Sequence, residues 1–139
     1  MLNRLKEREE KIQQVLEELR GETTRGIPVV VEGKNDVEAL HALYIEGNFI
    51  TVKTGGKSFL DIITKLEQSK VSEVILLLDF DRRGKQGTNH LRHSLEHSGI
   101  RVNLKFWREL MRLVSRDVQC IEGVATCLEN LRTKIAKDA

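Results

Sequence analysis

Two short apolar runs that each end in acidic residues constrain the fold of this chain more than any other feature. One run is PVVVEGKND at residues 28–36, and the other is VILLLDFDRRG at residues 74–84. Apolar runs of this length without polar alternation are typical of parallel strands that are covered on both faces. They carry Glu32, Asp79 and Asp81 to the strand ends. We therefore expect a parallel sheet with acidic side chains at one edge.

Strand-like and helix-like segments alternate along the whole chain. The predicted strands are residues 27–31, 49–53, 74–78 and 100–104, and amphipathic helices are expected between and after them. This alternation predicts an α/β fold with helices on both faces of a mainly parallel four-stranded sheet. Right-handed crossovers favour the strand order 2-1-3-4. In the helix that follows the first strand, Tyr44 is expected on the apolar side and therefore in the core.

Two further helices are expected at the ends of the chain. Residues 2–20 carry a broken apolar stripe, and Gly21 is expected to end that helix. The stripe indicates a helix packed on the sheet or on a second subunit, and a protein-binding arm is the alternative. Residues 121–135 have apolar positions at helical spacing and are expected to fold back on the domain.

Composition limits the chain to a single domain and says little about its partners. The chain has 139 residues and a net charge of only +2. No apolar stretch approaches the roughly 20 residues needed to span a bilayer, and the charged start MLNRLKEREEK does not resemble a secretory signal. We therefore expect a cytoplasmic protein without a membrane partner. Cys120 and Cys127 are expected to be reduced thiols, at least one of them packed.

The acidic residues point to a divalent cation. In the expected order, the first and third strands are neighbours at a switch point, where ligands bind beyond the carboxyl ends of the strands. Glu32, Asp79 and Asp81 would then converge, and hard oxygen ligands favour Mg²⁺ or Mn²⁺, as one ion or two. Glu32 has a second expected role as general acid or base. Asp36 has a structural role instead, because a negative charge is favoured in the first turn of its helix. For Glu32, Asp79 and Asp81 the alternative is a solvated cluster of acids without a metal.

Basic residues surround this predicted centre. Six of them fall in loops or strand ends at the same edge, and we expect them to bind phosphate: Lys34, Lys53, Lys57, Arg82, Arg83 and Lys85. A glycine turn, Gly55-Gly56, points to the same edge, but Thr51 stands where a P-loop requires glycine. A cation with basic residues around it is typical of phosphodiester or phosphoryl binding.

Two other polar sets are weaker candidates. Lys105, Arg108, Arg112 and Arg116 form a stripe that either extends the basic footprint or is a solvated helix face. His90, His93 and His97 share a helix face, where no acid or cysteine completes a zinc site. We expect a polar surface at the histidines, in reach of a nucleic-acid backbone.

These motifs together resemble the Toprim domain of topoisomerases, primases, OLD-family nucleases, RecR-type repair proteins and ribonuclease M5. The resemblance rests on Glu32-Gly33 with Asp36, on the Gly55-Gly56 turn, and on Asp79-x-Asp81-x-x-Gly84, and it covers residues 26–107. The whole chain also resembles small stand-alone Toprim proteins of archaea. Residues 1–25 and 108–139 would then be a helix and a helical extension added to the domain.

The resemblance implies a role for each matching residue. Glu32 would be the general acid or base and a metal ligand, and Asp79 and Asp81 would coordinate Mg²⁺. Gly33, Asp36 and Gly84 match structural positions, with the two glycines expected to allow sharp turns. Three other activities fit this sequence less well. A topoisomerase needs a nucleophilic tyrosine from another domain, and a primase needs further nucleotide-binding modules. Haloacid dehalogenase phosphatases normally carry Asp-x-Asp after the first strand, whereas here the motif follows the third strand.

Two hypotheses remain for the function. One is a Mg²⁺-dependent nuclease, most like ribonuclease M5 or the OLD nucleases, in which Glu32 takes part in hydrolysis of RNA or DNA. The other is a non-catalytic module that binds nucleic acid or a nucleotide through the same metal, as a homodimer or within a larger complex. Glu32 distinguishes the two hypotheses, because hydrolysis should need its carboxylate, whereas binding should survive Glu32→Gln.

Overall fold

The computed structural model describes residues 1–52, 59–114 and 118–138 of the chain. Its helices and strands alternate as the sequence predicts, with a helix at each end. In chain order they are α1 (Leu2–Thr24), β1 (Val29–Val31), α2 (Lys34–Ala42), β2 (Phe49–Thr51), α3 (Phe59–Gln68), β3 (Glu73–Leu77), α4 (Arg82–His97), β4 (Arg101–Asn103), α5 (Lys105–Leu113) and α6 (Ile121–Asp138).

The strands form one sheet in the order β2-β1-β3-β4, which confirms the predicted order. Every pairing is parallel, and in the central pair Val31 lies opposite Leu77. All three residues of β1 and four of the five in β3 are buried. These short apolar strands therefore occupy the middle of the sheet, as expected for strands that are covered on both faces.

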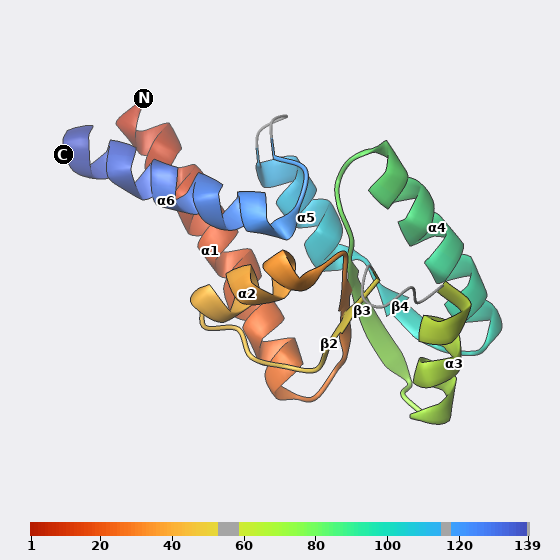
Figure 1. The fold of residues 1–139 in the computed structure, drawn as a ribbon. Coiled ribbons are helices and arrows are strands. Elements are labelled where there is room, and N and C mark those ends of the chain that lie inside the picture. Colours follow the sequence, from red (N-terminus) through yellow and green to blue (C-terminus); the bar gives the residue numbers. More distant parts are fainter. Residues whose placement is uncertain (53–58, 115–117, 139) are drawn as a thin grey trace.

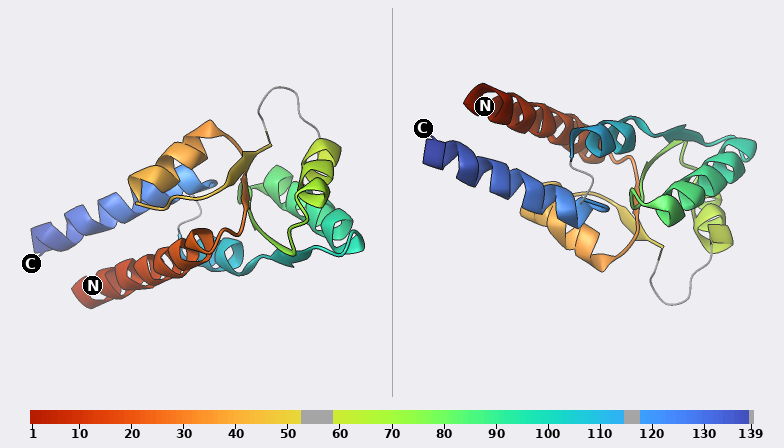
Figure 2. Two further views of the ribbon diagram at one scale, coloured as in Figure 1. Left: turned by 90° about the horizontal axis from the view of Figure 1, so that it is seen from below. Right: turned by 90° about the horizontal axis from the view of Figure 1, so that it is seen from above.

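Helices cover the two faces of the sheet unequally. Figure 2 shows α3 and α4 on one side of the sheet, and α1, α2, α5 and α6 on the other. In Figure 1, the far halves of α1 and α6 run side by side away from the sheet and bring the two chain ends near each other. Glu9 of α1 and Arg132 of α6 form an ion pair at 3.5 Å across this helix pair. The residues at the two ends of the chain thus build one helical layer.

The inner face of α1 is apolar, as its sequence pattern predicts. Ile12, Val15, Leu16 and Leu19 are buried there, and α1 packs on α5 and α6. No helix in the described part of the chain is both long enough and apolar enough to span a membrane.

Two local predictions were wrong. Gly21 does not end α1, which continues to Thr24 and is followed by Gly26 at φ +90°. Tyr44 is not in the core: its side chain is 82% exposed. Because α2 ends at Ala42 and Tyr44 adopts a φ of +62°, the chain turns and the next residue, Ile45, becomes the buried one. The Arg20 guanidinium donates to the Tyr44 carbonyl at 3.0 Å and holds this turn against α1.

Candidate metal centre

The first two predicted acids meet at the carboxyl ends of neighbouring strands. Glu32 follows β1 directly, and Asp79 lies two residues beyond the end of β3. The backbone N–H of Asp79 donates a hydrogen bond of 3.2 Å to Oε2 of Glu32. The strand order thus places these two residues where the switch-point argument expects a ligand site.

The third predicted acid, Asp81, is the N-cap of α4. Its Oδ1 accepts a hydrogen bond of 2.8 Å from the Gly84 N–H. A carboxylate at this position satisfies an otherwise unpaired amide of the first helical turn. The Asp81 side chain is therefore oriented by the start of α4, one residue beyond the buried Phe80.

Close packing, rather than a sharp turn, makes glycine necessary at residue 84. Gly84 is not among the described residues with positive φ. A Cβ at this position would lie 2.0 Å from the carbonyl oxygen of Asp79. The start of α4 therefore packs directly against the backbone of Asp79. Gly33, expected to allow a sharp turn as well, has an extended backbone at φ −154°, which any residue can adopt.

Asp36 connects two helices beneath the site. Its side chain is only 5% exposed. Oδ2 accepts from the Gly33 N–H at 3.1 Å, which is the local role that the sequence indicated. Oδ1 accepts from the Glu122 N–H at 3.3 Å, in the first turn of α6. Asp36 therefore fastens α6, a helix distant in the sequence, to the loop that follows β1.

The tightest group of potential ligands differs from the predicted trio. Among the described residues, Asp36, Asp79 and Cys120 form the group whose donor atoms all lie within 4.8 Å of one another. Asp79 belongs to this group, whereas Glu32 and Asp81 lie outside it. Two carboxylates fit a divalent cation, and the sulfur of Cys120 would add a softer ligand. No sequence signal marked Cys120, because its approach to Asp79 depends on how α6 packs.

Cys120 is held as a neutral thiol by its surroundings. Burial is the main cause that raises its pKa, and the negative charges of Asp36, Asp79 and Glu122 act in the same direction. A hydrogen bond from the Gly123 backbone opposes this shift. Cys120 and Cys127 are both half-buried and free, as expected for reduced thiols.

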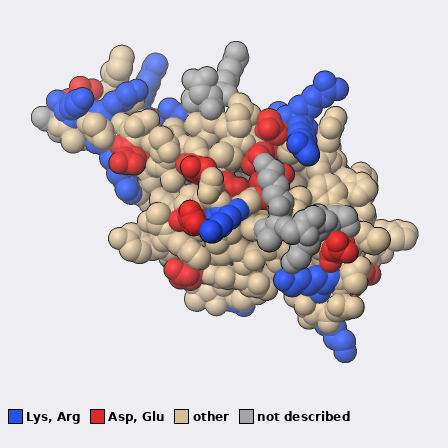
Figure 3. Space-filling model, viewed as in Figure 1, with Lys and Arg blue, Asp and Glu red and all other residues tan. Residues whose placement is uncertain are grey.

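A pocket opens over this group. It has a volume of about 320 Å³ and is lined by Asp36, Asp79, Cys120, Glu122 and residues 33–35. Lys34 also lines this pocket and is exposed. In Figure 3, acidic side chains gather near the middle of the face in view, and basic side chains lie beside them.

The other basic residues of the predicted rim divide into two sets. Arg82, Arg83 and Lys85 are exposed at the start of α4. Arg82 and Lys85 line a second depression, of about 420 Å³, together with Asp81. Lys53, Lys57, Gly55 and Gly56 lie outside the residues that the structure describes.

The two weaker sets have contacts of their own. Lys105 pairs with Glu18 of α1 at 2.7 Å, which directs this cation to another helix. Arg116, in the same predicted stripe, lies outside the described residues. His90, His93 and His97 are all exposed, and His90 stacks on Phe59 at 5.3 Å. The histidines thus form the polar face that the sequence favoured.

Comparison with known proteins identifies the family. Residues 26–104 match the Toprim domain model, which is more than half of the chain, so the chain belongs to the Toprim family. It is 39% identical to a UPF0292 protein of Methanocaldococcus jannaschii over 116 residues, which are 83% of this chain and 88% of that protein. It is 31% identical to a UPF0292 protein of Methanosarcina acetivorans over 93% of this chain and 88% of that protein.

A solved structure shows the same fold. The chain of a putative protein from Aquifex aeolicus superposes with a TM-score of 0.66 at 30% sequence identity, covering 79% of this chain and 94% of that chain. The predicted family and fold class are therefore confirmed. Toprim domains generally bind a divalent metal, and membership of the family suggests a metal-dependent function related to nucleic acid.

Proposed function

We propose that this protein is a Mg²⁺-dependent phosphodiesterase that cleaves nucleic acid, comparable to ribonuclease M5 or the OLD nucleases. The hydrogen bond from the backbone N–H of Asp79 to Glu32 carries the proposal most directly, because it holds the Glu32 carboxylate against the loop in which Asp79 follows β3. Lys34 and the exposed cations at the start of α4 lie at the same edge and suit a phosphate backbone.

We assign the predicted roles on this basis. Asp79 and Asp81 would hold Mg²⁺ or Mn²⁺, as one ion or two, with Glu32 as a further ligand, and Asp36 and Cys120 line the pocket beside Asp79. The metal, when bound, would supply positive charge that stabilises the developing charge on phosphorus oxygens. Lys34, Arg82, Arg83 and Lys85 orient the strand, together with Lys53 and Lys57.

Glu32 is the residue that we propose to move a proton. A carboxylate has about four acceptor positions on its two oxygens, and the Asp79 N–H uses one of them. The same hydrogen bond fixes the orientation of the side chain. Glu32 can therefore accept a proton from water, or give one to a leaving oxygen, without first changing its position.

A binding module is the second candidate. The pocket over Asp36, Asp79 and Cys120 would hold a metal equally well if no cleavage followed, and the protein would then act within a larger complex. The two functions differ in what Glu32→Gln changes. A nuclease should lose cleavage in that variant, whereas a module should keep its metal-dependent binding of the strand.

The deciding experiment measures cleavage of labelled RNA and DNA, single- and double-stranded, with Mg²⁺ or Mn²⁺. We expect metal-dependent cleavage by the wild type, and a loss of at least about 100-fold in Glu32→Gln and in Asp79→Asn. Glu38→Gln, an exposed acid on α2, is the matched control and should retain full activity. Binding without cleavage by the pure wild type would favour the module, and cleavage retained in Glu32→Gln would contradict its assigned role.

A further inference from the structure

A second pocket adjoins the acidic one and is built by the two end helices. It has a volume of about 660 Å³ and lies between α1, α6 and the segment before α6. Cys120 and Glu122 line both this pocket and the acidic one. The two pockets are therefore neighbours that share a wall. Its size suits a ligand larger than a single ion.

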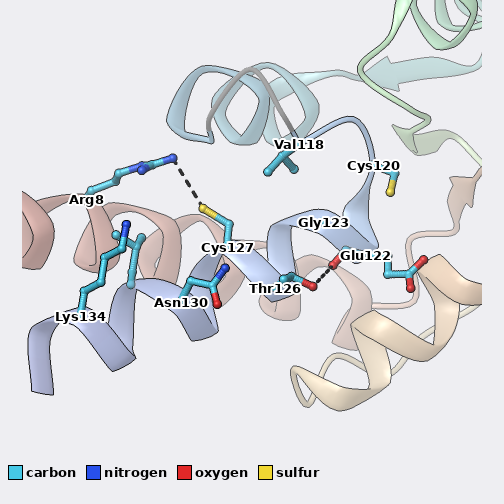
Figure 4. A pocket seen from close by; sticks show the side chains of 10 residues that line it. Arg8, Val118, Cys120, Glu122, Gly123, Thr126, Cys127, Asn130 and Lys134 are labelled. Carbon is cyan, nitrogen blue, oxygen red and sulfur yellow. Dashed lines mark hydrogen bonds between the residues drawn. The ribbon is translucent and has the colours of Figure 1, made fainter. Parts of the chain in front are cut away.

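The far end of this pocket is cationic. Figure 4 shows Arg8 of α1 and Lys134 of α6 at one end of the pocket, and Cys120 and Glu122 at the other. The chain from Cys120 to Cys127, beside Arg8, spans about 10 Å along a helix axis at 1.5 Å per residue. A single phosphate cannot contact both ends. Any ligand that does so is at least as long as a nucleotide.

Arg8 is oriented by the protein, and among the described residues it has no anionic partner. Its Nε donates to the Leu113 carbonyl at 2.7 Å, and one of its terminal nitrogens lies 3.5 Å from Sγ of Cys127. No carboxylate in the described part of the chain forms an ion pair with Arg8 or Lys134, although the adjacent Glu9 pairs with Arg132. A guanidinium has five N–H donors in a fixed plane, so several remain for an anion.

The half-buried position of Arg8 strengthens this argument. A cation that is partly removed from water loses hydration, and that loss is compensated when an anion binds beside it. Asn130, which also lines the pocket, provides a neutral hydrogen-bonding group on the same helix as Lys134. The pocket thus combines a fixed guanidinium and a flexible ammonium, a pair that suits the oxygens of a phosphate group.

We propose that this pocket binds a phosphate group of the nucleic-acid strand, separate from the phosphodiester at the acids. The inference rests on the proposed function, since it extends the same strand from the acidic pocket across Cys120 to Arg8. The helices α1 and α6 then form part of the substrate site, although both lie outside residues 26–104, which match the family model.

The test compares strand affinity in pocket and control variants. The probes are single-stranded 12-residue RNA and DNA oligonucleotides, titrated against the intact chain with Ca²⁺ in place of Mg²⁺ at several salt concentrations. We expect Arg8→Gln to weaken binding about tenfold for every sequence, and to reduce the slope of log affinity against log salt by about 1. Lys134 is exposed, so Lys134→Gln should keep the fold intact. We expect this variant to weaken binding about threefold. Arg4→Gln, one turn earlier on α1 and not in the pocket wall, should change affinity less than twofold.

Cys127 provides a local readout that does not depend on affinity alone. Its thiol lies in the pocket beside Arg8. A bound strand should slow its alkylation at least fivefold, measured on the separate Cys127 peptide by mass spectrometry. Strand binding by the wild type, with unchanged affinity in Arg8→Gln and Lys134→Gln or with no protection of Cys127, would overturn this inference and leave the proposed function standing. No strand binding by the wild type would overturn both.

Discussion

The loops at the strand ends and the helical layer of α1, α5 and α6 contribute to the site in different ways. The loops carry Glu32, Asp79 and Asp81, which follow directly from the sequence of β1 and β3. The helical layer supplies Cys120, Glu122 and Arg8, whose positions depend on packing between elements far apart in the chain. The family match ends at residue 104, before α5 and α6 begin. The acids of the proposed chemistry therefore lie in the shared domain, and the added helices shape the pockets around them.

Gly84→Ala, in the loop region, should lower the stability of the protein more than any other substitution proposed here. The new methyl group would lie 2.0 Å from the carbonyl oxygen of Asp79, and backbone cannot move aside as a flexible side chain does. We expect a loss of about 3 kcal/mol or more in the free energy of unfolding, measured by urea denaturation.

Gly87→Ala, on the same helix, is the control for this substitution. Its Cβ would meet Phe59 at 3.1 Å, at the far end of a side chain that can shift. It should therefore cost much less than Gly84→Ala. Equal losses in the two variants would show that the close approach to Asp79 is not what requires glycine at residue 84.

The sequence predicts the loop region well because local patterns determine it. The apolar runs locate β1 and β3, and the crossover rule then gives the strand order that brings Glu32 to Asp79. Close approach at Gly84 could not be predicted, because it depends on the angle at which α4 leaves the strand. The approach of Cys120 to Asp36 could not be predicted either, since it arises from the packing of α6 on α2.

Tyr44 shows a different limit of the sequence. Its apolar spacing indicated burial, but the helix ends at Ala42, two residues earlier, and a residue with φ of +62° turns away from the core. Gly21 shows a related limit, because a residue that often ends helices lies inside one here. Helix ends depend on which face the following segment must bury, and that is a tertiary property.

Asp36→Asn should separate the two regions. The two N–H groups of Gly33 and Glu122 bond different oxygens of Asp36, and in asparagine one of these oxygens becomes an NH2 group, which donates and cannot accept. We expect a loss of about 1–3 kcal/mol in the free energy of unfolding. Hydrogen exchange should become faster at the Glu122 amide, while the amides of β1 and β3 remain protected.

The control for Asp36→Asn is Glu38→Gln, which changes an exposed acid on the same helix. It should leave both stability and exchange unchanged. If exchange at Glu122 is as slow in Asp36→Asn as in the wild type, the hydrogen bond from α6 does not hold that helix in place, and other contacts fasten it to the site.

Gly21→Ala tests the helical layer alone and should have the smallest effect. Gly21 lies inside α1, its φ is not positive, and a Cβ there would meet nothing within 4 Å. Alanine should therefore stabilise the protein by about 0.5–1 kcal/mol, because glycine loses more conformational freedom in a helix. The melting temperature should rise by a few degrees.

Gly26→Ala is the matched opposite of Gly21→Ala. A Cβ there also meets nothing within 4 Å, but the Gly26 φ of +90° is unfavourable for alanine, so we expect a loss of about 1–2 kcal/mol in the free energy of unfolding.

Cleavage assays on both variants then sharpen the contrast between the regions. If α1 acts on the strand only through the Arg8 end of its pocket, a stiffer α1 at Gly21 leaves the cleavage rate unchanged. A rate that changes with Gly21→Ala would instead show that the far end of α1 also controls the position of the acids.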